Sequence, residues 1–200
     1  MDKITIKTGS NITKILQSTV DIPQAFTELV KNAIQNNATL CEIELKENSV
    51  VISDDGIGFS EIKGEDGMNS FDRYFVFGNS YDNTSGQGIR LGHMGIGGKL
   101  ANDKLSDVNT NWTIVTKNKH SKAFRMDYKP PKTEFLDDYS PGITELSESN
   151  VTTDHGTIVT INNLDLPILK NGWNTSRIRK ELQDFLTKNG VQTRDFFYPL

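Results

Sequence analysis

Apolar residues recur at helical spacing in two long segments of the chain. The first stripe has the i, i+3, i+4, i+7, i+8 spacing of one helix face and consists of Phe26, Leu29, Val30, Ala33 and Ile34. The second stripe consists of Ile178, Leu182, Phe185 and Leu186. The sequence therefore predicts a helix that begins near Asp21, with Pro23 tolerated in its first turn, and a final helix over about 175–187.

Shorter elements are predicted from weaker local signals. Ser10 is a suitable N-cap for a short helix, and another helix should run through Leu100 and Ala101 after a cluster of glycines. Segments with the alternation or the β-branched content of strands are 40–46, 49–53, 112–116, 123–128 and 157–161. A tight turn at Glu47-Asn48 joins the first two strands.

This order of elements predicts one sheet with helices over one face, which is a two-layer α/β sandwich. Between Asp54 and about Gly92 the composition shifts to Gly, Asn, Ser and Asp. Aromatic residues interrupt that stretch at Phe71, Tyr74, Phe75 and Phe77. So long a loop inside a compact domain is usually functional, and a lid is the standard case. No internal repeat or Pro/Gly linker divides the chain, so we expect a single domain over 1–200.

Composition narrows the classes of protein that fit this pattern. The 200 residues are 35% hydrophobic and 24% charged, with a net charge of −4, which is typical of a globular chain. The charge disfavours a domain whose whole surface binds nucleic acid, although a local basic patch is compatible with it. Cys41 is the single cysteine, so there is no internal disulfide, and a structural zinc site is disfavoured. We interpret Cys41 as a strand residue rather than as a reactive thiol.

No apolar run approaches the roughly 20 residues that a membrane-spanning helix needs, and the N-terminus has no signal-peptide core. We therefore expect a cytoplasmic protein without a membrane partner.

Three polar residues lie on the face of the first predicted helix that the apolar stripe leaves free. They are Glu28, Asn32 and Gln35, which helical geometry gathers within about 60° of one another. A solvated helix face would have the same composition. The functional interpretation is a carboxylate base beside a carboxamide ligand for Mg²⁺, an ion that prefers oxygen ligands and often takes only one or two of them from protein.

A second candidate segment, Ser53-Asp54-Asp55-Gly56-Ile57-Gly58-Phe59, lies where the second predicted strand ends. Asp-Gly is a common turn, so the segment could be a simple strand terminus. Alternatively, the Asp54 carboxylate could accept a hydrogen bond from an adenine amino group, while Gly56 and Gly58 let the backbone approach the purine.

The third candidate is the run Gly92-x-x-Gly95-x-Gly97, which leads directly into the predicted helix around Leu100. Backbone N–H groups at a helix start form an anion site when no side chains obstruct them. Flexible loops share this glycine content, so the pattern alone does not distinguish the two. The spacing is neither that of a Walker loop nor that of the dinucleotide fingerprint.

Taken in order, these segments resemble the GHKL superfamily, which includes DNA gyrase B, the ninety-kilodalton heat-shock chaperones, MutL, the MORC proteins and histidine kinases. The resemblance rests on four blocks over about 130 residues. They are Glu28-Leu29-Val30-Lys31-Asn32-Ala33, Asp54-Asp55-Gly56-Ile57-Gly58, Gly92-His93-Met94-Gly95-Ile96-Gly97 and Gly156-Thr157-Ile158-Val159-Thr160-Ile161. The resemblance implies the Bergerat fold, a mixed sheet with helices on one side.

The resemblance also implies roles for individual residues, with ATP and Mg²⁺ as ligands. Glu28 would be the general base that activates water, and Asn32 would bind Mg²⁺. Asp54 would bind the adenine amino group. The remaining nucleotide contacts would come from Gly56, Gly58 and Thr157 at the base, and from Gly92, Gly95, Ile96 and Gly97 at the phosphates. A lid over about 60–91 would close on the nucleotide.

Two features depart from the pattern of the family's ATPases. Gln35 stands where MutL and gyrase relatives often have an Asp, which is nearer to kinase usage. These ATPases also take a phosphate-contacting Lys or Arg from a following transducer domain, and we expect no such domain before Leu200. Lys99 lies near the phosphates by sequence, but the pattern assigns it no role.

Three classes of function remain open at this point. The first is an ATPase that couples slow hydrolysis to conformational change or to ATP-dependent homodimerisation. The second is the catalytic domain of a histidine kinase, and the third is a binding module without catalysis. Glu28 favours the ATPase, because kinases usually have Asn at that position. The sequence identifies no client protein, and nucleic-acid binding is not evident from it.

Overall fold

The computed structural model describes residues 21–46, 48–65, 67–75, 97–128, 141–147, 154–164 and 175–197. Its helices are α2 (Ile22–Gln35), α3 (Ser70–Phe75), α4 (Gly97–Leu105) and α6 (Thr175–Lys188). Its strands are β1 (Leu40–Lys46), β2 (Ser49–Asp54), β3 (Ser106–Lys117), β4 (Ala123–Tyr128), β5 (Gly142–Leu146), β6 (Gly156–Leu164) and β7 (Gln192–Phe197). The short helix predicted after Ser10 lies outside the described residues.

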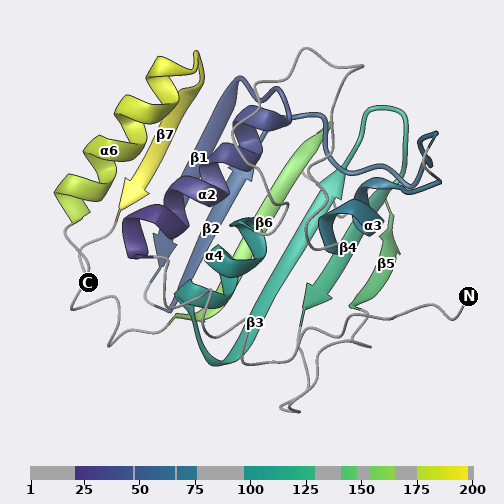
Figure 1. Cartoon of the computed structure of the whole chain (residues 1–200), viewed down its shortest axis with the longest axis horizontal. Helices are drawn as coiled ribbons and strands as arrows, with labels where there is room; N and C mark the ends of the chain where they lie inside the picture. Colours follow the sequence, from purple (N-terminus) through teal and green to yellow (C-terminus); the bar gives the residue numbers. More distant parts are fainter. Residues whose placement is uncertain are drawn as a thin grey trace, which may run out of the picture.

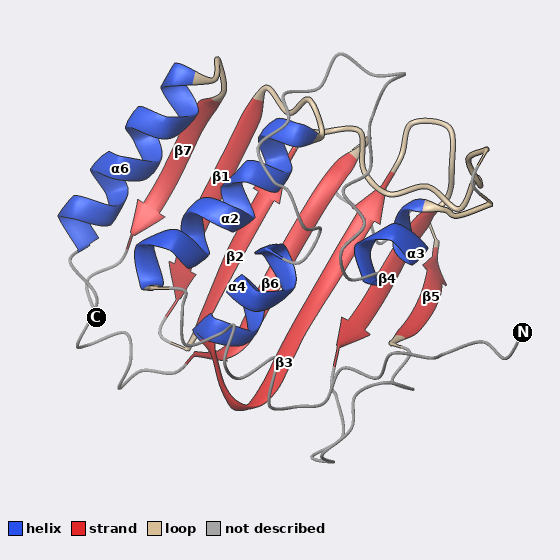
Figure 2. Cartoon of the chain, viewed as in Figure 1, coloured by secondary structure: helices blue, strands red, loops and turns tan. Residues whose placement is uncertain are grey.

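The strands form one seven-stranded sheet in the order β5-β4-β3-β6-β2-β1-β7. Neighbouring strands are antiparallel except β1 and β7, which are parallel, so the sheet is mixed. The four described helices lie on one face of the sheet (Figures 1 and 2). The predicted two-layer α/β sandwich is thus confirmed.

Helix α2 forms where the sequence predicts it, because its cap and its apolar stripe agree. Asp21 accepts a hydrogen bond from the Gln24 backbone at 2.7 Å, and Gln24 accepts one from the Asp21 backbone at 3.1 Å, which makes a capping box. Pro23 lies in the first turn, where a missing N–H is tolerated. The buried face of α2 consists of Ile22, Ala25, Phe26, Leu29, Val30, Ala33 and Ile34. Each large apolar side chain buried there stabilises the fold by roughly 1.5–3 kcal/mol.

The core lies between the helices and the sheet. On β1 and β2 alternate residues are buried, among them Cys41, Ile43, Val50 and Ile52. Burial, with a smaller contribution from the charge of Asp54, raises the pKa of the Cys41 thiol to about 12. The thiol is therefore protonated at neutral pH, which supports the interpretation of Cys41 as a core strand residue.

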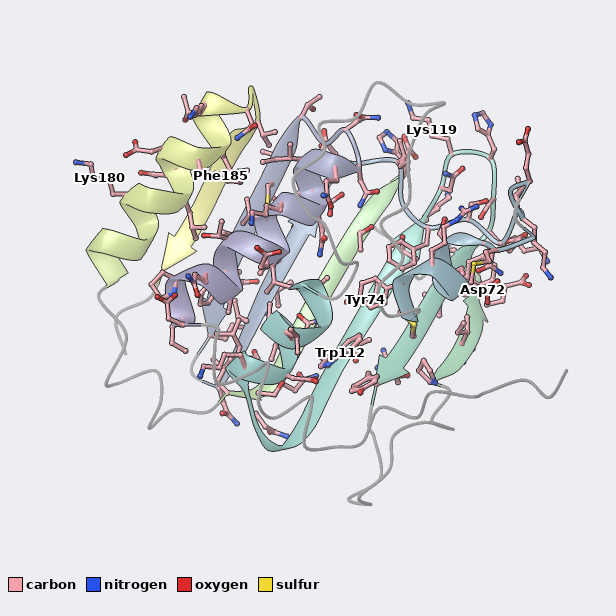
Figure 3. The ribbon with its side chains drawn as sticks, in the orientation of Figure 1. Asp72, Tyr74, Trp112, Lys119, Lys180 and Phe185 are labelled. Carbon is pink, nitrogen blue, oxygen red and sulfur yellow. The ribbon has the colours of Figure 1, made fainter. Side chains whose placement is uncertain are left out.

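Aromatic side chains join α3 to the sheet. The Phe71 ring lies 5.3 Å from that of Phe59 and 5.4 Å from that of Phe124, and Phe71 is buried. Tyr74 packs edge-on against Trp112 at 6.1 Å, and the two lie side by side in Figure 3. Residues 70–75, which lie within the predicted lid, are thus packed on the domain. The rest of that predicted lid after Phe75 lies outside the described residues.

Three elements were not predicted from the sequence. The side chains of β5 are mostly exposed, so no apolar alternation marks it as a strand. Strand β7 joins the sheet by pairing with β1, about 150 residues earlier in the chain, and no local signal specifies such a partner. Helix α3 has only six residues, too few for a periodic pattern.

Candidate functional site

The polar face of α2 meets the first turn of α4. A Cβ placed on Gly97 would collide with Oε2 of Glu28, and one on Gly98 would lie 2.7 Å from Nδ2 of Asn32. Only glycine therefore fits at these two positions without a shift of the neighbouring side chain. The first N–H groups of a helix have no partner within that helix, so the start of α4 can bind an anion next to Glu28 and Asn32.

Glu28 also contacts Lys31, three residues later on the same helix. The Lys31 ammonium forms an ion pair with Oε1 of Glu28, and the two side chains are 23% and 29% exposed, respectively. One oxygen of the Glu28 carboxylate thus meets a cation, and the other faces Gly97. Neither contact was predicted from the sequence, although the i, i+3 spacing of Glu28 and Lys31 is compatible with an ion pair.

The two carboxylates at the end of β2 have different environments. Burial raises the pKa of Asp54 to about 6, although its Oδ1 accepts a hydrogen bond from the Gly56 N–H at 2.8 Å. The neighbouring Asp55 carboxylate raises the pKa of Asp54 further, while a backbone hydrogen bond involving Thr157 and the charge of His155 lower it.

Burial would also raise the pKa of Asp55, but hydrogen bonds from Thr39 and Leu40 outweigh it and hold that pKa below its ordinary value. Asp55 accepts these bonds from the Thr39 N–H at 2.7 Å and the Leu40 N–H at 2.8 Å. Asp55 thereby ties the end of β2 to the start of β1. Asp54 takes no part in this tie, and its Oδ1 accepts from the Gly56 N–H instead.

The backbone of segment 56–59 lies against β3. Gly58 has a φ of +68°, and a Cβ there would collide with the Lys117 carbonyl oxygen. The Phe59 N–H donates to Oγ1 of Thr116 at 2.8 Å. Thr116 in turn donates to the Gly156 carbonyl at 3.1 Å, and its hydroxyl lies 3.2 Å from that of Thr157. Thr116 was missed from the sequence, because nothing local distinguishes a buried strand threonine.

The structure brings the predicted residues together in two groups. Glu28, Asn32 and Gly97 meet at the start of α4. Asp54, Gly56, Gly58 and Thr157 lie at the ends of β2 and β6, where Asp54 pairs with Thr157 in register. Gly92, Gly95 and Ile96 lie outside the described residues.

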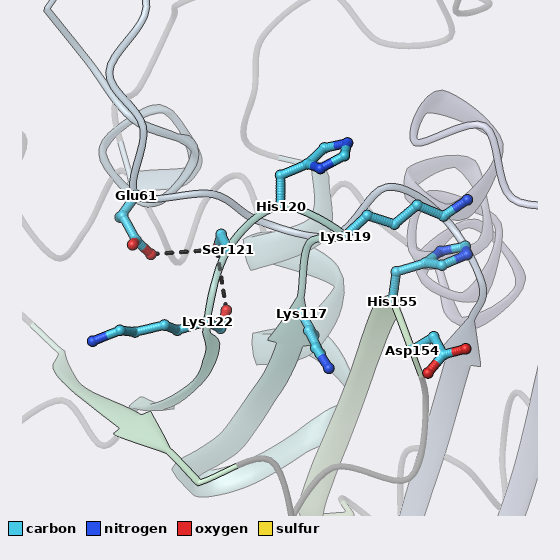
Figure 4. A pocket seen from close by; sticks show the side chains of 8 residues that line it. All are labelled: Glu61, Lys117, Lys119, His120, Ser121, Lys122, Asp154 and His155. Atoms are coloured by element: carbon cyan, nitrogen blue, oxygen red, sulfur yellow. Dashed lines mark hydrogen bonds between the residues drawn. The ribbon is translucent and has the colours of Figure 1, made fainter.

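Two hollows lie beside the turn between β3 and β4 and the start of β6. The larger, about 830 Å³, is shown in Figure 4 and is lined by Glu61, Lys117, Lys119, His120, Ser121, Lys122, Asp154 and His155. The smaller, about 430 Å³, shares Lys119, His120 and His155 with it. His155 donates from Nδ1 to the Gly56 carbonyl at 2.8 Å, and Asn118 donates to the Ile57 carbonyl at 2.9 Å. These two bonds hold the carbonyl groups of residues 56 and 57 in place.

Within the described ranges, no three His, Cys, Asp or Glu side chains are grouped in a way that could hold a metal ion. A metal ion in this part of the chain would therefore need other ligands, such as the amide oxygen of Asn32, phosphates and water. None of the described helices is long and apolar enough to cross a membrane.

Comparison with solved structures shows the same fold in topoisomerase ATPase regions. The ATPase and transducer domains of DNA topoisomerase II from Balamuthia mandrillaris match with a TM-score of 0.60 and 20% identity, over 87% of this chain and 46% of that one. The ATPase region of Saccharomyces cerevisiae topoisomerase II bound to ICRF-187 (dexrazoxane) matches with a TM-score of 0.58 and 16% identity, over 87% and 47%. The chain thus spans about half the length of these structures.

Comparison with sequences gives a match at the level of the family. No curated protein matches the chain significantly. A family model described as histidine kinase-, DNA gyrase B- and HSP90-like ATPase matches residues 20–157, which include both groups of candidate site residues. The chain therefore belongs to the family of histidine kinase-, DNA gyrase B- and HSP90-like ATPases.

Proposed function

We propose that the chain binds Mg·ATP between α2, α4 and the end of β2, and hydrolyses it slowly to drive conformational change or dimerisation. The observation that carries this proposal is the meeting of Glu28 and Asn32 with Gly97 and Gly98 at the start of α4. A carboxylate, a carboxamide and a helix N-terminus at one point are the groups that a base, a metal ligand and a phosphate site require.

The residues of the site fit the two ends of the nucleotide. At the phosphate end, Gly92, Gly95, Ile96 and Gly97 would supply backbone N–H groups, and the amide oxygen of Asn32 would be a ligand of Mg²⁺. Bound Mg²⁺ would neutralise negative charge on the phosphate oxygens. Part of the segment 60–91 would act as a lid.

At the base end, Asp54 offers only an acceptor when it is ionised, so adenine with its 6-amino group is favoured over guanine with its 6-oxo group. Gly56, Gly58 and Thr157 would line the base. Glu28 would accept a proton from the attacking water. Slow turnover is expected because the Glu28 carboxylate is paired with Lys31 and must leave that contact before it can accept a proton.

Glu28→Gln tests the assignment of the base. A general base contributes about 10²–10⁴-fold to the rate, so this variant should lose turnover by a factor of that order. It should still bind ATP, because the substitution removes no contact that attracts the phosphates. The measurement is phosphate release at saturating ATP, alongside calorimetric binding.

Glu44→Gln is the matched control, since Glu44 lies on β1 in an exposed ion pair with Lys46. It should hydrolyse ATP like wild type. Glu28 is not the base if the Glu28→Gln variant hydrolyses ATP as fast as wild type. Phosphate transfer to a histidine peptide without hydrolysis would replace the proposal with a histidine-kinase function.

A further inference from the structure

The Lys31 ammonium lies next to the proposed phosphate site, on the far side of the Glu28 carboxylate from Gly97. The ammonium contacts one oxygen of Glu28, and the other oxygen of that carboxylate faces Gly97 at the start of α4. Asn32, the next residue of α2, faces Gly98 in the same turn. The Glu28 carboxylate thus bridges the lysine to the helix start that would bind the phosphates.

The position of Lys31 matters electrostatically because the Glu28 carboxylate would repel a triphosphate bound beside it. The proposed site needs Glu28 to be ionised for proton abstraction, so a compensating cation is required close by. Charge-assisted contacts between an ammonium and phosphate oxygens are about twice as strong as neutral hydrogen bonds. A lysine has a flexible four-carbon stem, so its ammonium can exchange one anionic partner for another nearby.

We propose that Lys31 is a phosphate-contacting residue: its ammonium leaves the Glu28 carboxylate for the terminal phosphates of bound ATP. This inference rests on the proposed function. The exchange supplies positive charge to the phosphates from within the helix that holds the base. It also releases the Glu28 carboxylate, which is then able to orient water.

The exchange has a consequence for the nucleotide series. Phosphates compete with Glu28 for Lys31, so the lysine matters for ATP and ADP and not for AMP, whose single phosphate lies nearer the base. Removing the competitor should strengthen ATP binding. Glu28→Gln should therefore bind ATP about 2–5-fold more tightly than wild type, by analogy with the modest strength of partly exposed ion pairs.

Calorimetry with ATP, ADP and AMP on Lys31→Met and Lys31→Arg tests the proposal. Lys31→Met should bind ATP roughly 10-fold or more weakly, the range for losing a charged hydrogen bond, and AMP should change by less than about 2-fold. Lys31→Arg should recover most of the ATP affinity, because it retains the charge.

Lys46→Met is the matched control, because Lys46 also pairs with a glutamate but lies at the end of β1 opposite to the end that pairs with Asp54. It should bind all three nucleotides like wild type. Suppose that wild type binds ATP. If Lys31→Met then binds ATP as tightly as wild type, or loses as much affinity for AMP as for ATP, the inference on Lys31 is wrong and the proposed function stands. If wild type itself binds no ATP, the proposed function fails and the inference fails with it.

Discussion

At the scale of single residues, adjacent carboxylates of the same type have opposite properties. The Asp54 carboxyl has its pKa raised by burial, whereas the pKa of Asp55 is lowered by hydrogen bonds that outweigh the effect of burial. Asp55 is engaged by the backbone of Thr39 and Leu40. A buried carboxyl with a raised pKa lowers the stability of the fold when ionised, so a group of this kind often has a functional reason to be there.

The raised pKa of Asp54 predicts a stability that depends on pH. The unfolded chain releases this proton at the ordinary pKa of 3.8, while the folded chain holds it to about pH 6. The folded state therefore loses stability as pH rises from about 4 to about 6, by roughly 2–3 kcal/mol. Asp54→Asn keeps the acceptor for the Gly56 N–H and removes the titration. It should be more stable than wild type at pH 7 and equally stable near pH 4.

Urea unfolding of both proteins at several pH values measures this difference, and other carboxylates cancel in the comparison. A difference in unfolding free energy that stays constant from pH 4 to pH 7 would contradict the assignment. Binding of ADP to Asp54→Asn should weaken at pH 7 because the charged acceptor is gone, which would separate the contribution of Asp54 to binding from its contribution to stability.

Gly58 and Gly67 allow a second residue-scale prediction, because both have a positive φ, +68° and +75° respectively. A Cβ at position 58 would collide with the Lys117 carbonyl, whereas one at position 67 would meet nothing within 4 Å. Gly67→Ala should therefore destabilise the fold by about 1 kcal/mol through backbone strain alone. Gly58→Ala should destabilise it by about 2–4 kcal/mol, because the segment 56–59 must move away from β3.

Thermal and urea denaturation would measure the loss of stability in each of the two variants. Equal destabilisation would mean that segment 56–59 shifts freely, which would also weaken the case for a rigid base pocket.

At the scale of elements, α2 combines the core and the site in one helix. Its apolar stripe is buried against the sheet, and its other face carries Glu28, Lys31 and Asn32. A change that shifts the helix axis therefore affects the packing of the core and the contact with Gly97 together. The position of α2 is set at its N-terminus by the capping box of Asp21 and Gln24.

Removing that cap should weaken α2 by a predictable amount. Asp21→Ala leaves the Gln24 N–H without its acceptor and should destabilise the fold by about 1 kcal/mol, while Asp21→Asn should retain most of the stability. The unfolding free energy from urea titration gives both values. A destabilisation by Asp21→Asn as large as that by Asp21→Ala would show that charge, rather than the capping hydrogen bond, is the main contribution.

At the scale of the whole molecule, one mixed sheet with helices on a single face positions both groups of site residues. Strands β2 and β6 pair in register so that Asp54 lies opposite Thr157, and β3 supplies Thr116 and the Lys117 carbonyl behind them. Strand β7 extends the sheet beyond β1, and Leu182, Leu186 and Val191 complete the core there. The site thus draws on residues from 28 to 157, which explains why its parts appear in the sequence as separate blocks.

The two-layer class, the hairpin of β1 and β2, and the helices α2, α4 and α6 follow from patterns that are local in the chain. The spacing of apolar residues such as Phe26, Leu29 and Val30 predicts a helix because it matches the helical period. The blocks around Glu28, Asp54 and Gly97 were also recognised from the sequence, since each needs particular residue types at short spacing. Their assignment as base, adenine contact and phosphate site stays a prediction.

Only the tertiary structure decided which of these side chains meet. The Phe59 N–H donates to Thr116 across 57 residues of sequence, and Gly97 contacts Glu28 across 69. The structure also showed that Asp55 accepts hydrogen bonds from the backbone around Thr39, whereas Asp54 does not. It further showed that Lys31 forms an ion pair with Glu28. The sequence by itself determined the elements, because helical and strand periodicity act over a few residues. The contacts that define the site required the structure, because they depend on the packing of α2, α4 and the sheet, which no local pattern encodes.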